Sequence, residues 1–156
     1  MSPFMALCLI RYYMLWSSYL WFCHQIFSRE IIIIRMQVQA DVISVLVEKM
    51  EILTLDLFSS LLPVLIGLLD SKTERHVKVS LDLLLKLVAV FGPMIRSTVS
   101  APPSVGVDLH AQQRRECCNQ CFMQLQKIHM ILPILVRRGG LLAKSAQELN
   151  LVLQQC

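Results

Sequence analysis

Hydrophobic side chains recur at steps of three and four between residues 74 and 91, which is the spacing of one face of an α-helix. The members of this stripe are Val77, Leu81, Leu84, Val88 and Phe91. Charged side chains fall on the opposite side of the same helix: Arg75, Lys78, Asp82 and Lys86. A helix that is apolar over much of its surface and polar along one stripe has neighbours on two sides. The pattern therefore predicts one helix of a layered array.

Residues 55–69 are apolar almost all round, which predicts a helix buried on most of its sides. Thr54 is a candidate N-cap, and Asp56 lies in the first turn, where the helix dipole favours an anion. Pro63 removes one helical hydrogen bond, so it predicts a kink or a restart within this segment.

A long helical pattern begins after Asp108, a candidate N-cap, and ends at the Gly139-Gly140 pair. Its apolar positions again step by three and four: Cys118, Cys121, Leu125, Ile128, Leu132 and Leu135. Residues 141–153 form a last amphipathic pattern, which predicts a final helix.

Two further start signals lie nearer the N-terminus. Asp41 is a candidate N-cap for a first helix over residues 42–53. The segment from Ser71 to Glu74 has the spacing of a capping box before the helix that follows it.

Breaks in the pattern separate the predicted helices. The Gly92-Pro93 pair predicts a kink or an interruption, and the Pro-rich segment 101–107 cannot remain helical. No alternation typical of a strand appears between residues 40 and 156. The expected fold is all-α, with about five to seven antiparallel helices joined by short loops and one longer loop.

The first 39 residues differ from the rest of the chain and form an apolar, atypical N-terminal segment. Residues 12–28 carry no full charge, which makes this run borderline for a membrane span of roughly 20 apolar residues. A small membrane-anchored helical protein, with residues 1–28 as the anchor, is therefore the alternative interpretation. The interpretation we favour is an apolar helix packed on the domain or an unusual alternative start, so membrane association is not expected. The β-branched run 31–34 has strand propensity.

The composition permits one domain with a hydrophobic core but does not indicate a particular ligand. The chain has 156 residues, is 55% hydrophobic and carries a formal net charge of +4. That charge permits weak attraction to an acidic surface without requiring nucleic acid, which we do not expect as a partner. The six cysteines are not spaced like a disulfide framework, so reduced thiols are expected.

No set of residues with a catalytic or metal-binding spacing stands out. Cys118 and Cys121 have the spacing of half a zinc site, but no second ligand pair accompanies them. No Gly-rich phosphate loop and no paired carboxylates appear. We therefore expect no catalytic residues, no metal and no cofactor, and a chain that is not an enzyme.

Basic side chains are the remaining candidates for binding. They recur at the predicted helix ends, where they could form one electropositive face: Arg75, Lys78, Arg96, Arg114, Arg115, Arg137 and Arg138. Such a face would suit a partner with an acidic surface.

Three stretches carry a resemblance to a known family. They are Ala-Asp-Val-Ile-Ser-Val-Leu-Val-Glu-Lys at 40–49, Val-Ser-Ala-Pro-Pro-Ser-Val-Gly-Val-Asp-Leu-His-Ala at 99–111, and Arg-Arg-Gly-Gly-Leu-Leu-Ala-Lys-Ser-Ala-Gln-Glu-Leu-Asn-Leu-Val-Leu at 137–153. Together with the helices between them, they resemble the C-terminal domain of the katanin regulatory subunit. The resemblance covers residues 40–153 and predicts a domain over 40–156.

The resemblance implies a HEAT-like helical array, an α-solenoid, that acts as a non-catalytic interaction module. It implies pairing with the AAA ATPase subunit of katanin, and binding to microtubules and to spindle-pole or minus-end proteins, which targets severing. The implied location is the cytoplasm and cytoskeleton, at microtubules and the centrosome or spindle pole. The WD-repeat propeller of the family is not expected in these residues, which contain no Trp-Asp dipeptide and no repeat of about 40 residues.

Overall fold

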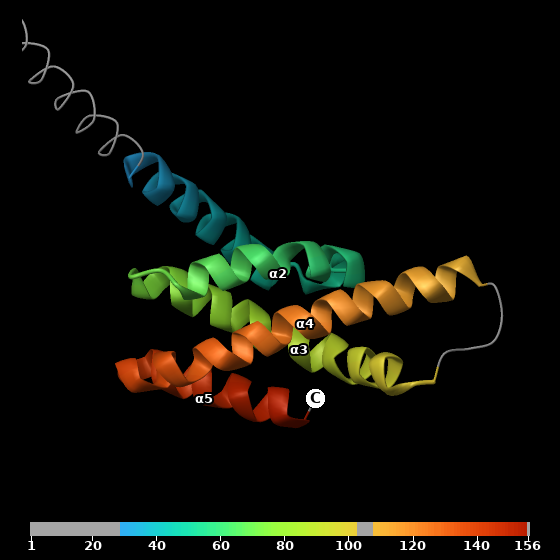
Figure 1. Ribbon diagram of the computed structural model, residues 1–156. Helices are drawn as coiled ribbons and strands as arrows, with labels where there is room; N and C mark the ends of the chain where they lie inside the picture. Colours follow the sequence, from blue (N-terminus) through green and yellow to red (C-terminus); the bar gives the residue numbers. More distant parts are fainter. Residues whose placement is uncertain (1–28, 103–107, 156) are drawn as a thin grey trace, which may run out of the picture. The chain divides into compact units, whose positions relative to one another are not determined.

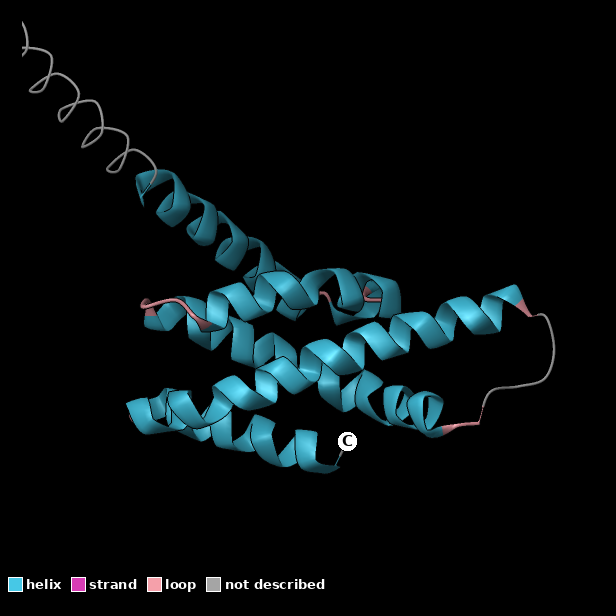
Figure 2. Cartoon of the chain, viewed as in Figure 1, coloured by secondary structure: helices cyan, strands magenta, loops and turns pink. Residues whose placement is uncertain are grey.

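A computed structural model of the chain describes residues 29–102 and 108–155. Within these ranges it contains five α-helices, one short 3₁₀ turn and no strand, so the all-α prediction is confirmed (Figure 2). In chain order the elements are a helix over residues 29–48, η1 (Met50–Ile52), α2 (Leu55–Leu69), α3 (Glu74–Ser100), α4 (Leu109–Arg138) and α5 (Gly140–Gln155). The apolar run at 12–28 lies outside the described residues.

The chain divides into two compact units, residues 1–38 and residues 39–156. In the first unit, the described residues 29–38 are helical. The β-branched run 31–34 therefore forms helix and not the strand that its propensity favours. The intrinsic cost of a β-branched residue in a helix is below about 0.7 kcal/mol, which is too small to prevent helix formation.

In the second unit, residues 39–48 are helical, and the prediction of a helix that starts after Asp41 is wrong. Asp41 lies inside the helix, and its carboxylate accepts a hydrogen bond from Arg75 Nη2 at 2.6 Å. Ala40 and Ile43 are buried, and Lys86 Nζ donates to the carbonyl of Val47 at 3.0 Å. The Asp41 carboxylate therefore pairs with Arg75 of α3 instead of capping a helix.

Helix α2 has the bounds that its apolar run predicts. Thr54 Oγ1 accepts a hydrogen bond from the Leu57 amide at 3.3 Å, as expected for the N-cap. Pro63 lies on an exposed side of the helix, and α2 continues through it without a restart. The packing of the buried side, which includes Phe58 and Leu62, outweighs the one hydrogen bond that proline removes.

Helix α3 supplies the centre of the core. Val77, Leu81, Leu84 and Val88 are fully buried, as their spacing predicts. The ring of Phe91 stacks on that of Phe58 from α2, with ring centroids 5.7 Å apart. These contacts fix the face that α3 turns toward α2.

The interruption predicted at Gly92-Pro93 is wrong, because α3 remains helical to Ser100. Pro93 is exposed, while Gly92 before it and Ile95 after it are buried. Burial on both sides of the proline holds the helix together across the missing hydrogen bond.

The capping box predicted at Ser71 is also wrong. The N-cap of α3 is Thr73, whose side chain makes no capping hydrogen bond. Ser71 Oγ instead accepts from the Thr73 amide at 3.2 Å and lies 3.0 Å from Nδ1 of buried His76. The Ser71 hydroxyl thus fixes the turn before the helix rather than the helix end itself.

Helices α3 and α4 each pack against both α2 and α5, and α3 also packs on α4 (Figure 1). All six apolar positions predicted for α4 are buried. Asp108 caps α4 by accepting from the amides of His110 and Ala111. Gly139 and Gly140 have φ values of 78° and 71°, a conformation that favours glycine, and they turn the chain from α4 into α5. This arrangement is compatible with a HEAT-like array.

Candidate partner-binding surface

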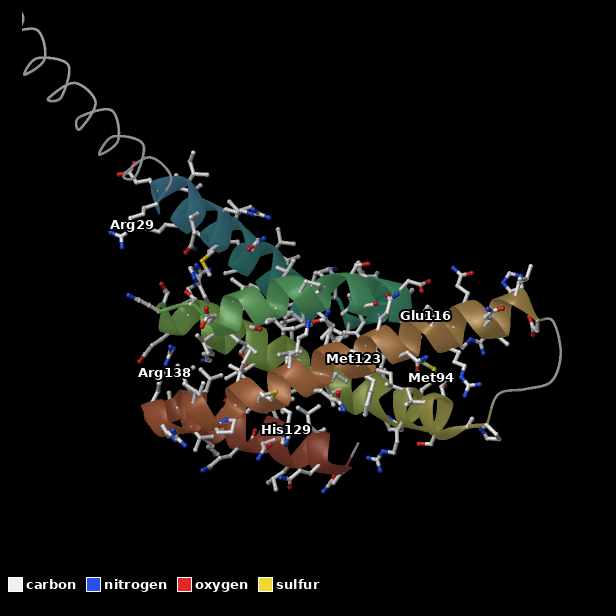
Figure 3. The ribbon with its side chains drawn as sticks, in the orientation of Figure 1. Arg29, Met94, Glu116, Met123, His129 and Arg138 are labelled. Carbon is white, nitrogen blue, oxygen red and sulfur yellow. The ribbon has the colours of Figure 1, made fainter. Side chains whose placement is uncertain are left out.

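A second apolar stripe runs along α4, opposite the buried one. Met123, Met130 and Ile134 are spaced by seven and four residues, so they share one face of the helix. Their exposed fractions are 59, 77 and 56%. Figure 3 labels Met123 near the middle of α4, away from both helix ends. We call these three side chains the outer stripe of α4.

Cations border the outer stripe. Lys127 lies one helical turn from both Met123 and Met130, and Arg137 lies one turn beyond Ile134; both are exposed. An apolar centre with a charged rim is the usual composition of a protein-binding surface. The stripe has the same spacing signal as the buried face, but the sequence interpretation did not single it out.

Four of the seven predicted basic residues belong to one end of the array. Arg75 and Lys78 lie in the first turns of α3, and Arg137 and Arg138 end α4. Arg138 Nη1 donates to the carbonyl of Ser71 at 3.2 Å, which places the end of α4 beside the turn before α3. The charge of Arg75 is offset by Asp41, so it contributes less to a basic surface than the sequence indicates.

The other three predicted basic residues lie at the opposite end of the α3–α4 pair. Arg115 donates to the carbonyls of Ala101 and Pro102, directly beyond the end of α3. This arginine therefore binds the backbone of its own chain. Arg96 and Arg114 are exposed.

The two ends are well separated. Arg75 and Arg96 are 21 residues apart on α3, which corresponds to roughly 30 Å along a helix. Arg96 borders a hollow with Leu153 of α5, whereas Arg114 borders one with Leu55 and Asp56 on the α2 side. The structure thus divides the seven residues into separate groups instead of one patch, and their binding role stays a prediction.

The cysteine turn faces the interior between α2 and α4. Cys118 and Cys121 are buried, and the Cys117 thiol points to the Leu55 carbonyl at 3.8 Å. Burial raises the pKa of Cys117, and it raises the pKa of Cys121 to about 12. These thiols stay protonated at neutral pH, which makes them poor nucleophiles and poor metal ligands.

The described residues contain no group of three His, Cys, Asp or Glu side chains arranged to hold a metal ion. None of the helices in the described ranges is long and apolar enough to cross a bilayer. The proposed anchor at 1–28 lies outside those ranges, so that alternative stays a prediction.

Comparison with known proteins settles the family. The sequence profile of the con80 domain of katanin matches residues 31–153. The chain belongs to the katanin con80 family. The resemblance inferred from residues 40–153 is confirmed, and the match begins upstream of the predicted boundary at residue 40.

Among curated proteins, the chain is similar to katanin p80 subunits from plants and animals. It is 68% identical over 117 residues to the katanin p80 WD40 repeat-containing subunit B1 homolog KTN80.2 of Arabidopsis thaliana. It is 70% identical over 118 residues to the homolog KTN80.1 of the same plant. It is 33% identical over 121 residues to the katanin p80 WD40 repeat-containing subunit B1 of Danio rerio.

These alignments cover 75 to 76% of this chain but only 10 to 17% of the relatives. The chain therefore spans a small part of the length of the p80 subunits that it matches. The relatives are p80 subunits of katanin, so the prediction that the chain is not an enzyme is confirmed by its family. Its identity as a katanin regulatory-subunit module rests on the same comparison.

Proposed function

We propose that this con80 chain is a binding module for the AAA ATPase subunit of katanin and that it targets microtubule severing. The observation that carries the proposal is the outer stripe of α4, in a chain that belongs to the con80 family. A folded module with one face in its own core and a second apolar face exposed has a surface suited to another protein.

The chemistry of the stripe supports a protein partner. Met123 and Met130 are flexible, polarisable side chains that adapt to a facing helix. Burying a side chain of this size contributes about 1.5–3 kcal/mol, so three such residues provide a substantial apolar centre for binding. Lys127 and Arg137 at the border of the stripe are positively charged and complement acidic residues on the partner.

Microtubule contact is the second part of the proposal. Arg96, Arg114 and Arg137 are exposed, and no hydrogen bond or ion pair to another described residue accompanies them. Tubulin has an acidic surface, which such side chains attract through a field screened beyond about 8–10 Å. The location proposed for the chain is accordingly the cytoplasm, on microtubules and at the centrosome or spindle pole, with spindle-pole or minus-end proteins as further partners.

Titration of the purified ATPase subunit into the full chain tests the first part of the proposal. Size-exclusion chromatography with light scattering measures whether a complex of defined mass forms. Such a complex supports the proposal, and separate elution at concentrations well above those in a cell contradicts it.

A further inference from the structure

A small hollow lies where α5 ends against α3 and α4. Its volume is about 200 Å³, and its walls are largely apolar. The lining residues are Gly92, Ile95, Arg96, Phe122, Leu125, Gln126, His129 and Leu153. They come from three helices of the second unit, so the hollow is a feature of the array itself.

The helix lengths and one glycine explain why this space is open. Helix α5 has 16 residues, against 27 in α3 and 30 in α4, so it covers only part of their shared groove. Leu153, in the last turns of α5, forms the wall at which that cover stops. Gly92, which lines the hollow, contributes no side chain to fill it.

The size of the hollow indicates what could occupy it. Pockets for cofactors and drug-sized ligands measure roughly 300–1,000 Å³, which is larger than this one. An apolar cavity of about 150 Å³ is large enough to bind benzene. A volume of about 200 Å³ therefore suits a single aromatic ring rather than a whole small molecule.

The polar residues of the lining make the site attractive to negative charge. Arg96, Gln126 and His129 are exposed, and no carboxylate is among the eight lining residues. The guanidinium of Arg96 makes no hydrogen bond or ion pair with another described residue. Figure 3 shows His129 on the side of α4 that faces α5. An unpaired arginine beside an apolar hollow complements a carboxylate next to an aromatic side chain.

We propose that this hollow is a docking site for one aromatic side chain of a partner segment, with acidic residues on either side of the aromatic one. The ring enters between Gly92, Phe122 and Leu153, and the carboxylates pair with Arg96 at the border. Because these residues are not part of the outer stripe of α4, the site is separate from the proposed ATPase-binding surface and does not depend on it.

Nuclear magnetic resonance titration of the ¹⁵N-labelled full chain with short peptides tests this site. The first peptide is acetyl-Gly-Glu-Glu-Phe-Glu-Glu-Gly-amide. The second replaces its Phe by Ala, and the third replaces all four Glu by Lys. Arg96→Glu is the test variant, and Lys144→Glu, at an exposed cation on α5 that does not line the hollow, is the matched control with the same charge change.

The Phe peptide with glutamates should shift the amide signals of Gly92 and Gln126. Its affinity should fall about tenfold or more with Arg96→Glu, and much less with Lys144→Glu. The Ala peptide and the lysine peptide should bind at least as weakly as the Phe peptide binds the Arg96→Glu variant. Absence of shifts with the Phe peptide at millimolar concentration overturns the proposal, as does equal binding of the Ala peptide. Equal losses in the two variants also overturn it, because they indicate attraction to the overall charge.

Discussion

Arg138, the last residue of α4, donates a hydrogen bond from Nη1 to the carbonyl of Ser71, 67 residues earlier in the chain. The contact joins the end of α4 to the turn between α2 and α3. Its neighbour Arg137 makes no such contact with the described residues and is exposed. Two adjacent arginines at one helix end therefore differ in their contacts.

Substitution should distinguish Arg138 from Arg137. Arg138→Ala removes a charge-assisted hydrogen bond and should lower the free energy of unfolding by roughly 1 kcal/mol. Arg137→Ala should leave stability within about 0.5 kcal/mol, because it is a surface change, and should weaken binding to microtubules. Thermal melting and co-sedimentation at two salt concentrations measure both quantities. Unchanged sedimentation of the Arg137→Ala variant at both salts would make this arginine an ordinary surface residue.

The centre of the α3 stripe should not tolerate a charge. Leu84→Asp places a carboxylate in a fully buried position, where an unpaired charge costs several kcal/mol. A typical domain has only about 5–15 kcal/mol of stability, so this variant should unfold. Val90→Asp, on the same helix at a position that is 61% exposed, is the control and should stay folded. Circular dichroism during heating compares them, and a wild-type melting curve for Leu84→Asp would show that the helix face is wrongly assigned.

Alkaline pH should weaken the fold in part through Cys121. Burial raises its pKa from the ordinary value of 9.0 to about 12. Between these values the unfolded chain releases the proton while the folded chain keeps it. The contribution of this thiol is thus complete below pH 9 and is lost as pH rises toward 12. The melting temperature of Cys121→Ala should fall less steeply than that of the wild type from pH 8.5 to 10.5, and parallel curves would contradict the assignment.

The helical array should fold without the segment before it. The second compact unit begins at Gln39, close to the boundary predicted at residue 40. A chain shortened to start at Ala40 keeps Asp41 and its bond to Arg75. It should show a cooperative thermal transition by calorimetry, alone or with the ATPase subunit. If it melts without cooperativity in both cases, residues before Ala40 are part of the folding unit.

Local sequence patterns predict much of this fold because the local and tertiary preferences agree. Helix α2 has an N-cap at Thr54 and an apolar surface on nearly all sides, so its bounds follow from the sequence. The stripe of α4 from Cys118 to Leu135 is buried as its spacing requires. In these elements a single period identifies both the helix and the buried face.

The wrong predictions share a different cause, which is a tertiary contact stronger than a local signal. Asp41 is a good N-cap residue, but it bonds Arg75, which is 34 positions away. The Gly92-Pro93 pair is a good helix breaker, but packing on both sides keeps α3 continuous. The residues next to Asp41 and next to Pro93 in the sequence do not reveal these tertiary contacts.

The candidate binding surface was the least predictable part. Helix α4 carries a second apolar stripe of only three residues, Met123, Met130 and Ile134, which does not stand out in the sequence beside the six-residue stripe that is buried. The basic residues were expected to share one face. Their distribution to separate ends follows from the lengths and orientations of the helices. The positions of charged residues in the sequence do not give these orientations.

Binding to the ATPase subunit through the outer stripe of α4 is the central claim, and calorimetric titration of that subunit with a matched pair of variants tests it most directly. Met130→Glu puts a charge in the stripe at a position that is 77% exposed. Leu151→Glu makes the same kind of change on α5, at a position that is 58% exposed. Both variants should melt like the wild type. The wild type and Leu151→Glu should bind the ATPase subunit with similar affinity, while Met130→Glu should bind at least about tenfold more weakly. Equal affinities for all three chains would contradict the claim.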